Sequence, residues 1–255
     1  MSATESPVLS VRDLRVAIGA TEIVHGLSFD VHAGQTVGIV GESGSGKSLS
    51  VLSATRLMDL PHQRVTGESL LHGQDLVRAT PAQLRRVHGR EVGFVFQDPS
   101  TSLNPLLTLE RQLTEGPEAH LRLSHSAARS RAIGLLEAVG LPDPERRLNA
   151  YPHQLSGGQR QRVMIAIALA CDPSLLIADE PTTALDVTTQ AQIIELVREM
   201  QRERGMAVVW ISHDLGVIGQ VADEVTVLYR GNAVEQRPVL ELFDAPGHDY
   251  TRRLL

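Results

Sequence analysis

The chain has one cysteine, few aromatic residues and no long hydrophobic run. Cys171 stands alone, so no disulfide can form within the chain and no cysteine-based metal site is possible. A lone cysteine suits a reducing compartment. Aromatic residues make up only 3% of the sequence, so the core is predicted to be mainly aliphatic.

The sequence also lacks membrane-entry segments and an excess of positive charge. No apolar run approaches the roughly 18 residues that span a bilayer, and Met1 to Pro7 lack the charged and apolar regions of a signal peptide. A net charge of -6 argues against nucleic-acid binding, which usually needs a basic patch. We expect a cytoplasmic chain that reaches membranes only through partners. Local arginine groups are interpreted as solvated helix faces or, alternatively, as a docking surface for an acidic partner: Arg85, Arg86, Arg90, Arg129 and Arg131.

Apolar patterns predict strands towards both ends of the chain. Leu9–Val16 and Leu27–Val31 alternate as antiparallel strands do. Three further runs are short and wholly or largely apolar, the last two being typical of parallel core strands: Val92–Phe96, Leu175–Ala178 and Ala207–Ile211. A hairpin is predicted where Arg230-Gly231-Asn232 separates Val225–Tyr229 from Ala233–Val234.

Helical patterns occupy the middle of the chain, from Pro99 to about Ala170. Apolar residues recur at helical spacing over Ser126–Val139, and further helices are predicted over Gln159–Ala170 and Thr188–Arg204. The sequence therefore predicts an α/β core interrupted by a helical insertion. The predicted limits are 7–98 and 172–245 for the core, 99–171 for the inserted helical subdomain and 246–255 for a C-terminal tail.

Gly41-Glu42-Ser43-Gly44-Ser45-Gly46-Lys47-Ser48 fits G-x-x-x-x-G-K-[ST], the P-loop that holds nucleotide phosphates. The pattern places Lys47 on the β- and γ-phosphates and the Ser48 hydroxyl on Mg²⁺. A buried strand, Thr36–Val40, precedes the loop, and a helix is predicted from Ser48 to Met58. This order disfavours a chance match by a Gly/Ser-rich linker. The residues expected to contact ATP are Gly41, Ser43, Gly44, Ser45, Gly46, Lys47, Ser48 and Leu49.

Two apolar strands end in residues that suit phosphate chemistry. Asp179 follows Leu175–Ala178 and can hold the hydration shell of Mg²⁺, while Glu180 can polarise the attacking water as general base. Two adjacent acids can also be surface charge, but the P-loop upstream favours the catalytic interpretation. His213 ends the strand Ala207–Ile211, where it can contact a γ-phosphate or serve a structural role.

Leu155-Ser156-Gly157-Gly158-Gln159 precedes a helix and offers backbone N–H groups to an anion. This segment resembles the signature motif of the ATP-binding-cassette (ABC) ATPases, and the resemblance covers nearly the whole chain. It implies a P-loop cassette with an antiparallel β subdomain and an inserted α-helical signature subdomain. It further implies that Gln97 is the Q-loop glutamine and a metal ligand, and that Asp179 and Glu180 form Walker B and the catalytic base. Ala184-Leu185-Asp186 would be the D-loop, and His213 the switch histidine.

The resemblance also implies a dimer. Two cassettes pack head to tail, so that the signature of one caps the ATP in the P-loop of the other, and a monomer is incomplete. The residues implied to reach the nucleotide in this way are Ser156, Gly157, Gly158, Gln159 and Asp186. One departure stands out: ABC cassettes usually stack adenine on an aromatic residue where this chain has Ile18, so weaker nucleotide affinity or looser adenine preference is expected.

Three further segments resemble the ATPase subunits of oligopeptide, dipeptide and nickel importers: Gln97–Pro105, Tyr151–Gln154 and His248–Leu255. The resemblance implies two integral membrane permeases as partners, an extracytoplasmic solute-binding protein as an indirect one, and a peripheral location at the cytoplasmic face of the cell membrane. It also implies that roughly Gln97 to Gln112 receives a coupling helix from a permease. Peptides, nickel, glutathione and opines all remain open as solutes.

Two other functions are alternatives to import. A soluble ABC ATPase in a non-transport complex, such as a carbon–phosphorus lyase accessory protein, shares the subfamily motifs and stays an alternative. A degenerate cassette that only binds is disfavoured, because Lys47, Glu180, His213 and the signature glycines are intact. Many relatives continue past the Tyr-Thr-Arg segment, so a short natural protein, half of a tandem cassette or a shortened chain are all compatible with this sequence.

Overall fold

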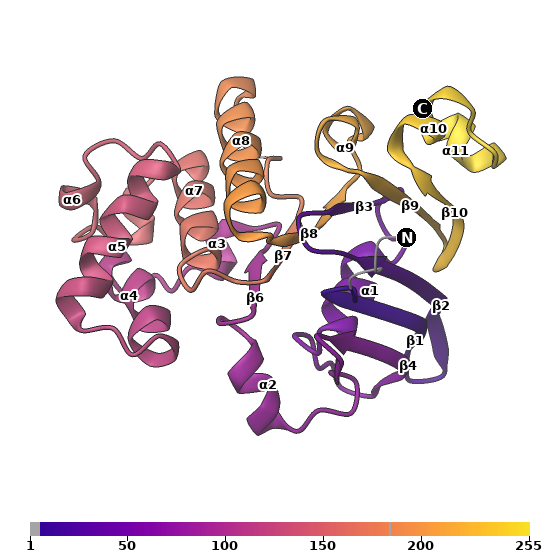
Figure 1. The fold of residues 1–255 in the computed structure, drawn as a ribbon, viewed down its shortest axis with the longest axis horizontal. Coiled ribbons are helices and arrows are strands. Elements are labelled where there is room, and N and C mark those ends of the chain that lie inside the picture. The colour runs from indigo at the N-terminus through magenta and orange to yellow at the C-terminus, as the bar shows by residue number, and fades with distance from the viewer. Residues whose placement is uncertain (1–5, 184) are drawn as a thin grey trace. The chain divides into compact units, whose positions relative to one another are not determined.

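The structure, a computed structural model, describes residues 6–183 and 185–255 and divides into two compact units (Figure 1). The first unit contains the chain up to Leu84 together with Ala207–Leu255, and the second contains Arg85–Met206. Residues 1–5, at the start of the N-terminal segment, and Ala184 of the implied D-loop lie outside the described residues. The domain limits given above stay a prediction.

An antiparallel sheet in the order β2-β1-β4-β5 belongs to the first unit. Its strands are β1 (Leu9–Ile18), β2 (Thr21–Val31), β4 (Gln63–Leu71) and β5 (Gln74–Asp75). The two predicted antiparallel strands are confirmed, and both are longer than predicted because a tight hairpin joins Ile18 to Thr21. The sequence pattern does not predict β4, because the first half of that strand is largely exposed and lacks apolar alternation.

Strand β3 (Thr36–Val40) is fully buried in the first unit and lies between two parallel neighbours. These are β8 (Ala207–Ser212) and β9 (Glu224–Tyr229), and β10 (Asn232–Pro238) pairs antiparallel with β9. The predicted hairpin is therefore confirmed, with Asn232 opposite Tyr229. Parallel strands end at the same edge of a sheet, so the loops that follow β3, β8 and β9 meet there.

The helix after the P-loop is shorter than the sequence predicts. α1 spans Lys47–Ala54, so the prediction of a helix over Ser48–Met58 is wrong at its end. The Thr55 hydroxyl donates to the Val51 carbonyl oxygen at 3.0 Å, and Arg56 has a φ of 54°. A residue in the left-handed region ends an α-helix, because it turns the backbone away from the helical path.

Three short helices in the first unit have no clear sequence periodicity: α9 (Leu215–Val221), α10 (Val239–Asp244) and α11 (Asp249–Leu254). Helices of six or seven residues cover less than two turns, too few for a 3.6-residue pattern to be read. α9 packs on β3 and β8 and is capped by the Asp214 carboxylate, which accepts from Gly216 N–H at 2.8 Å. The cap shows why the chain turns into a helix directly after His213.

The second unit contains a parallel pair of strands and most of the helices. β6 (Val92–Val95) pairs with β7 (Leu175–Asp179), with Val95 opposite Ala178. The predicted helical stretch is confirmed and contains α3 (Pro99–Ser102), α4 (Leu109–His120), α5 (His125–Ala138), α6 (Pro144–Arg147), the 3₁₀ turn Pro152–Gln154 and α7 (Gly157–Ala168). The helix predicted over Thr188–Arg204 is also confirmed, as α8 (Val187–Arg204). α2 (Pro81–Val87) crosses the limit between the units.

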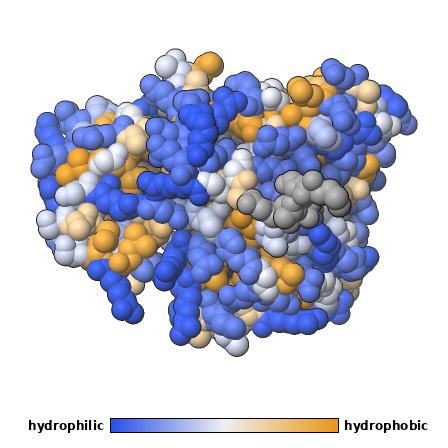
Figure 2. Space-filling model, in the orientation of Figure 1, coloured by the Kyte–Doolittle hydropathy of each residue, from blue (hydrophilic) through white to orange (hydrophobic). Residues whose placement is uncertain are grey.

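The core is aliphatic, as the composition predicts. Most of its buried side chains are Val, Leu, Ile and Ala, and Trp210 on β8 is among the largest that are fully buried. The visible surface is mostly hydrophilic, with small hydrophobic areas scattered over it (Figure 2). Within the described ranges, none of the helices is both long and apolar enough to cross a bilayer.

Glu235 on β10 is a buried carboxylate that holds the turn before α11. It accepts hydrogen bonds from the N–H groups of Gly247 at 2.7 Å and His248 at 3.0 Å, and it pairs with Arg237 at 3.0 Å. Burial opposes ionisation of this group. The nearby Thr251 side chain, the N–H groups of Gly247 and His248 and the charge of Arg237 outweigh burial, so the pKa of Glu235 is lowered.

We predict that Glu235→Gln lowers the free energy of unfolding at neutral pH. Because the folded-state pKa lies below the unfolded value of about 4.3, the carboxylate stabilises the fold above that value and loses this effect as pH falls through the folded pKa. Thermal unfolding of both proteins from pH 7 down to about pH 3.5 would measure it. The gap in Tm between them should narrow towards low pH; a constant gap would contradict the prediction.

Candidate functional site

The P-loop forms a tight backbone turn between β3 and α1, as the motif predicts. Gly41, Gly44 and Gly46 have φ values of 154°, 80° and 99°, a range that residues with a Cβ rarely adopt. Gly46 is the N-cap of α1, and Lys47 is its first residue. The N–H groups at the start of this helix favour an anion, because they carry partial positive charge.

Lys47 is buried against the loop that it follows. Lys47 is only 7% exposed. Its Nζ atom donates hydrogen bonds to the carbonyl oxygens of Gly41, at 2.7 Å, and Glu42, at 2.9 Å. Two backbone carbonyls therefore orient the ammonium within the turn. A positive charge held within a glycine-rich turn is suited to bind phosphate groups.

Glycine at position 41 is required by a close backbone approach. A Cβ there would collide with the Leu228 carbonyl oxygen at the end of β9, and it would lie 2.8 Å from the Ser45 hydroxyl. The turn between β9 and β10 also holds the P-loop, because the Gly231 N–H donates to the Ser45 carbonyl oxygen at 2.9 Å. The P-loop motif does not predict this support from the β9–β10 turn, since the contact joins residues far apart in sequence.

The remaining P-loop residues differ in exposure. Ser43 and Gly44 are exposed, whereas Ser48 and Leu49 are half-buried. Ser45 is 5% exposed, and its hydroxyl is buried without a hydrogen-bond partner among the described residues. A buried hydroxyl with free hydrogen-bonding capacity suits a site that receives a polar ligand.

His213 lies at the same edge of the sheet as the P-loop. Val40, the last residue of β3, is directly opposite Ser212, the last residue of β8. Gly41 and His213 therefore follow neighbouring parallel strands at matching positions, and His213 is exposed there. Ile18 ends β1 and is half-buried.

Strand ends gather a second group of predicted residues in the second unit. Val95 on β6 is opposite Ala178 on β7, so Gln97 and Asp179 both emerge from the carboxyl ends of paired strands. Asp179 and Glu180 are 6% and 8% exposed, while Gln97 is exposed. The neighbouring Asp98 caps α3 by accepting from Ser100 N–H at 2.8 Å.

Glu180 occupies an unusual backbone conformation. Its φ is 50°, a left-handed value that is uncommon for glutamate. The Thr183 hydroxyl contacts both the carbonyl oxygen of Glu180, at 3.1 Å, and its Oε2 atom, at 3.0 Å. Backbone strain of this kind concentrates at functional sites, where the surrounding structure holds it in place.

The signature segment is a helix cap. The Ser156 hydroxyl accepts from Gln159 N–H at 3.3 Å, and the Gln159 side chain accepts from Ser156 N–H at 3.1 Å. This reciprocal capping box leaves Gly157 and Gly158 as the first residues of α7. Ser156 and Gln159 therefore have a structural role that the motif alone does not reveal.

Asp186 caps the following helix, α8. It accepts from the backbone N–H of Thr189 at 3.0 Å and from its hydroxyl at 2.7 Å. The side-chain hydrogen bond from Thr189 is the main reason that the pKa of Asp186 is lowered. The same hydroxyl accepts from Arg162 of α7 at 2.5 Å, so Asp186 is tied to the helix that the signature begins.

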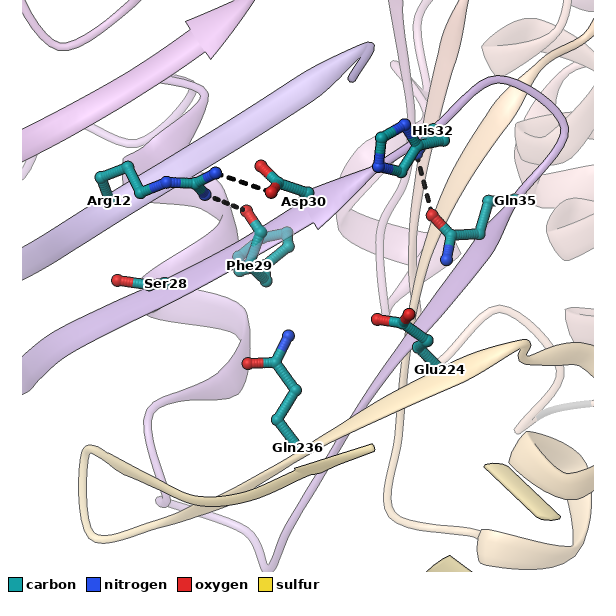
Figure 3. Close-up of a pocket in the computed structure, with 8 residues that line it drawn as sticks. All are labelled: Arg12, Ser28, Phe29, Asp30, His32, Gln35, Glu224 and Gln236. Atoms are coloured by element: carbon teal, nitrogen blue, oxygen red, sulfur yellow. Dashed lines mark hydrogen bonds and ion pairs between the residues drawn. The ribbon is translucent and has the colours of Figure 1, made fainter. Parts of the chain in front are cut away.

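A separate polar pocket of about 310 Å³ lies in the first unit, and Figure 3 shows its lining side chains. Arg12 reaches the Asp30 carboxylate at 2.6 Å, and the His32 N–H donates to the Gln35 side chain at 2.9 Å. None of residues 41–48 lines this pocket. In the described part of the chain, no group of three or more His, Cys, Asp or Glu residues could hold a metal ion by itself.

A strand, a glycine-rich loop with an inward lysine and a helix together define a P-loop nucleotide-binding protein. The chain belongs to the ABC transporter family, whose model, described as "ABC transporter", matches residues 24–183. It is accordingly an ATPase, as the sequence motifs predict. The predicted cassette fold is confirmed as well.

Individual relatives agree with this assignment. The chain is 49% identical to a putative peptide import ATP-binding protein of Brucella abortus, over 100% of this chain and 78% of that protein. It is 47% identical to the oligopeptide transport ATP-binding protein OppD of Bacillus subtilis, over 97% and 71%. A solved ATP-binding cassette, a dimer in a post-hydrolysis state bound to ADP and phosphate, superposes with a TM-score of 0.81 at 30% identity, covering 91% of this chain and 98% of its own.

We predict that Gly41→Ala weakens nucleotide binding roughly tenfold or more, because backbone strain of about 1–3 kcal/mol must be relieved by moving the loop. Titration with a fluorescent ATP analogue would measure the dissociation constant. Gly134→Ala in α5 is the matched control, since a Cβ there meets nothing within 4 Å. Wild-type affinity in Gly41→Ala would show that the loop tolerates the collision.

Proposed function

We propose that this chain is the subunit that binds and hydrolyses ATP to drive peptide import through membrane permeases. The observation that carries the proposal is the P-loop geometry, in which a tight glycine turn holds the Lys47 ammonium against the carbonyl oxygens of Gly41 and Glu42. The names of the relatives, peptide import and oligopeptide transport ATP-binding proteins, support peptides over nickel, glutathione or opines as the solute.

The donor set of the site fits ATP with Mg²⁺. Lys47 and the loop N–H groups would bind the β- and γ-phosphates, and the Ser45 hydroxyl, which has no hydrogen-bond partner among the described residues, would add a donor within the same turn. Ser48, Gln97 and Asp179 would hold Mg²⁺. Mg²⁺ at such sites is bound through one or two carboxylates and the substrate phosphates. When bound, Mg²⁺ would neutralise the charge that develops on the phosphates.

Glu180 is proposed as the general base. Its carboxylate would accept a proton from the attacking water, and the Thr183 hydroxyl, 3.0 Å from Oε2, would orient it. His213 is proposed to contact the γ-phosphate from the edge of β8, beside the P-loop. Gln97 follows the end of β6, which pairs with β7, and its side chain would act as a ligand of Mg²⁺ together with Asp179.

A second cassette is proposed to complete the site. Gly157 and Gly158 begin α7 with N–H groups that no helical turn satisfies, and such groups favour an anion. The signature residues Ser156–Gln159 and Asp186 would reach the ATP held by the partner cassette. The dimeric state of the solved cassette that contains ADP and phosphate supports this arrangement.

Two permeases and a solute-binding protein are the other proposed partners, with the chain at the cytoplasmic face of the membrane. The segment Gln97–Gln112 is proposed as the permease-docking surface. Within this segment, Leu106 lies between α3 and α4 and is 83% exposed. Burial of this apolar side chain against a permease would remove it from water and so favour docking.

Glu180→Gln is expected to slow ATP hydrolysis by about 10²–10⁴-fold, the usual effect of losing a general base. ATP binding should persist, because the phosphate-binding turn is unchanged. Steady-state phosphate release and ATP titration would measure the two effects. Glu203→Gln, an exposed substitution of the same kind near the end of α8, should hydrolyse like wild type. Turnover of Glu180→Gln near the wild-type rate would remove this residue from the role.

The transport function is tested by recovering the native chain from detergent-solubilised membranes and identifying its partners by mass spectrometry. We expect integral membrane proteins of permease type. Leu106→Ser should reduce their recovery without changing ATP affinity, whereas Leu240→Ser, at a residue 73% exposed on α10, should not. Recovery only from the soluble fraction would favour the alternative, an ABC ATPase of a non-transport complex.

A further inference from the structure

The C-terminal helix contributes a side chain to the P-loop. The Glu42 N–H donates to the Tyr250 hydroxyl oxygen at 2.8 Å, joining α11 to the second residue of the loop. Tyr250 is 2% exposed, and its ring lies against Tyr229, at the end of β9, with centroids 4.3 Å apart. A buried tyrosine whose hydroxyl meets a defined partner is held in one place.

This hydrogen bond acts on the same peptide unit that holds Lys47. The Glu42 N–H and the Gly41 carbonyl belong to one planar peptide and point to opposite sides of it. Tyr250 accepts from the N–H, while Lys47 Nζ donates to the carbonyl at 2.7 Å. Rotating this peptide would break both contacts together.

The peptide needs such a restraint because it follows a glycine. Glycine has more backbone freedom than any other residue type. The φ of 154° at Gly41 does not by itself fix the orientation of the peptide that follows it. Ser45 N–H donates to the Glu42 carbonyl oxygen at 3.2 Å, but this bond acts on the following peptide. Among the described hydrogen bonds, the one to Tyr250 restrains the N–H end of the Gly41–Glu42 peptide.

Tyr250 is itself anchored firmly enough to act as a restraint. The buried Glu235 carboxylate holds the turn before α11 through Gly247 and His248. The His248 side chain then accepts from Tyr250 N–H at 3.1 Å and caps the helix. A chain of hydrogen bonds therefore runs from β10 to the P-loop through side chains that are mostly buried.

We propose that Tyr250 is a positioning residue of the nucleotide site. Its hydroxyl keeps the Gly41–Glu42 peptide in the orientation that presents the Gly41 carbonyl to Lys47, and so sets where the ammonium meets the phosphates. The inference rests on the proposed role of residues 41–48 in binding ATP. It makes the C-terminal segment, from Gly247 to Leu254, part of what determines nucleotide affinity.

Tyr250→Phe tests the proposal, because it removes the hydroxyl and keeps the ring against Tyr229. Binding of ATP and of ADP would be titrated with the full chain carrying Glu180→Gln, so that hydrolysis does not disturb the measurement. The dissociation constants should rise about two- to tenfold, the effect of losing one neutral hydrogen bond. In the chain with Glu180 intact, KM for ATP should rise by a similar factor while kcat changes little.

Tyr229→Phe is the matched control. It removes a hydroxyl from the adjacent ring, and in the described chain that hydroxyl makes no hydrogen bond to residues 41–48. Its nucleotide affinity should equal that of wild type. Affinities are to be compared well below the Tm of each variant, so that a loss of stability is not counted as a loss of binding.

The outcomes separate the two proposals. If Lys47→Ala weakens ATP binding but Tyr250→Phe does not, the positioning role is overturned and the P-loop assignment stands. If Tyr250→Phe lowers only the Tm, Tyr250 is a structural residue and the inference is again overturned. If Lys47→Ala leaves ATP affinity unchanged, the proposed function of the loop fails, and the inference fails with it.

Discussion

The contact between the Lys47 ammonium and the carbonyl oxygens of Gly41 and Glu42 is the interaction on which the site in the first unit depends. It requires a turn so tight that the loop passes against the Leu228 carbonyl, where only glycine fits. That approach in turn requires β3 to lie between β8 and β9 as a buried parallel strand. Sheet, turn and lysine therefore form one arrangement, and a change in any of them reaches the others.

In the second unit, too, polar side chains follow the ends of parallel strands, but they are carboxylates and an amide rather than a lysine. The paired strands β6 and β7 end together, and this brings Gln97 beside Asp179 and Glu180. Helix caps then position the remaining polar groups: Asp98 begins α3, Ser156 begins α7 and Asp186 begins α8. The proposed function gives these separate features one interpretation, because strand ends and helix N-termini are positions that can bind nucleotide phosphates.

The support around the P-loop comes from residues that no nucleotide motif contains. Gly231 in the β9–β10 turn donates to the Ser45 carbonyl, and Tyr250 in α11 accepts from Glu42. Glu235 holds the turn that leads to Tyr250. Gly231, Glu235 and Tyr250 are thus linked to the P-loop by hydrogen bonds, although they lie far from it in sequence.

The sequence alone determined the P-loop, the order of the main strands and helices, and the family, because each depends on local patterns: glycine and lysine spacing, apolar runs and helical periodicity. It did not determine β4, which is largely exposed in its first half, or the helices α9 to α11, which are too short to show a periodic pattern. It also did not determine the end of α1, which is set by the Thr55 cap. Only the tertiary structure revealed the positive φ of Glu180, the collision that reserves position 41 for glycine and the bond from Glu42 to Tyr250. These features depend on contacts between residues far apart in the chain, or on the backbone angles that such contacts impose, and no local pattern encodes them.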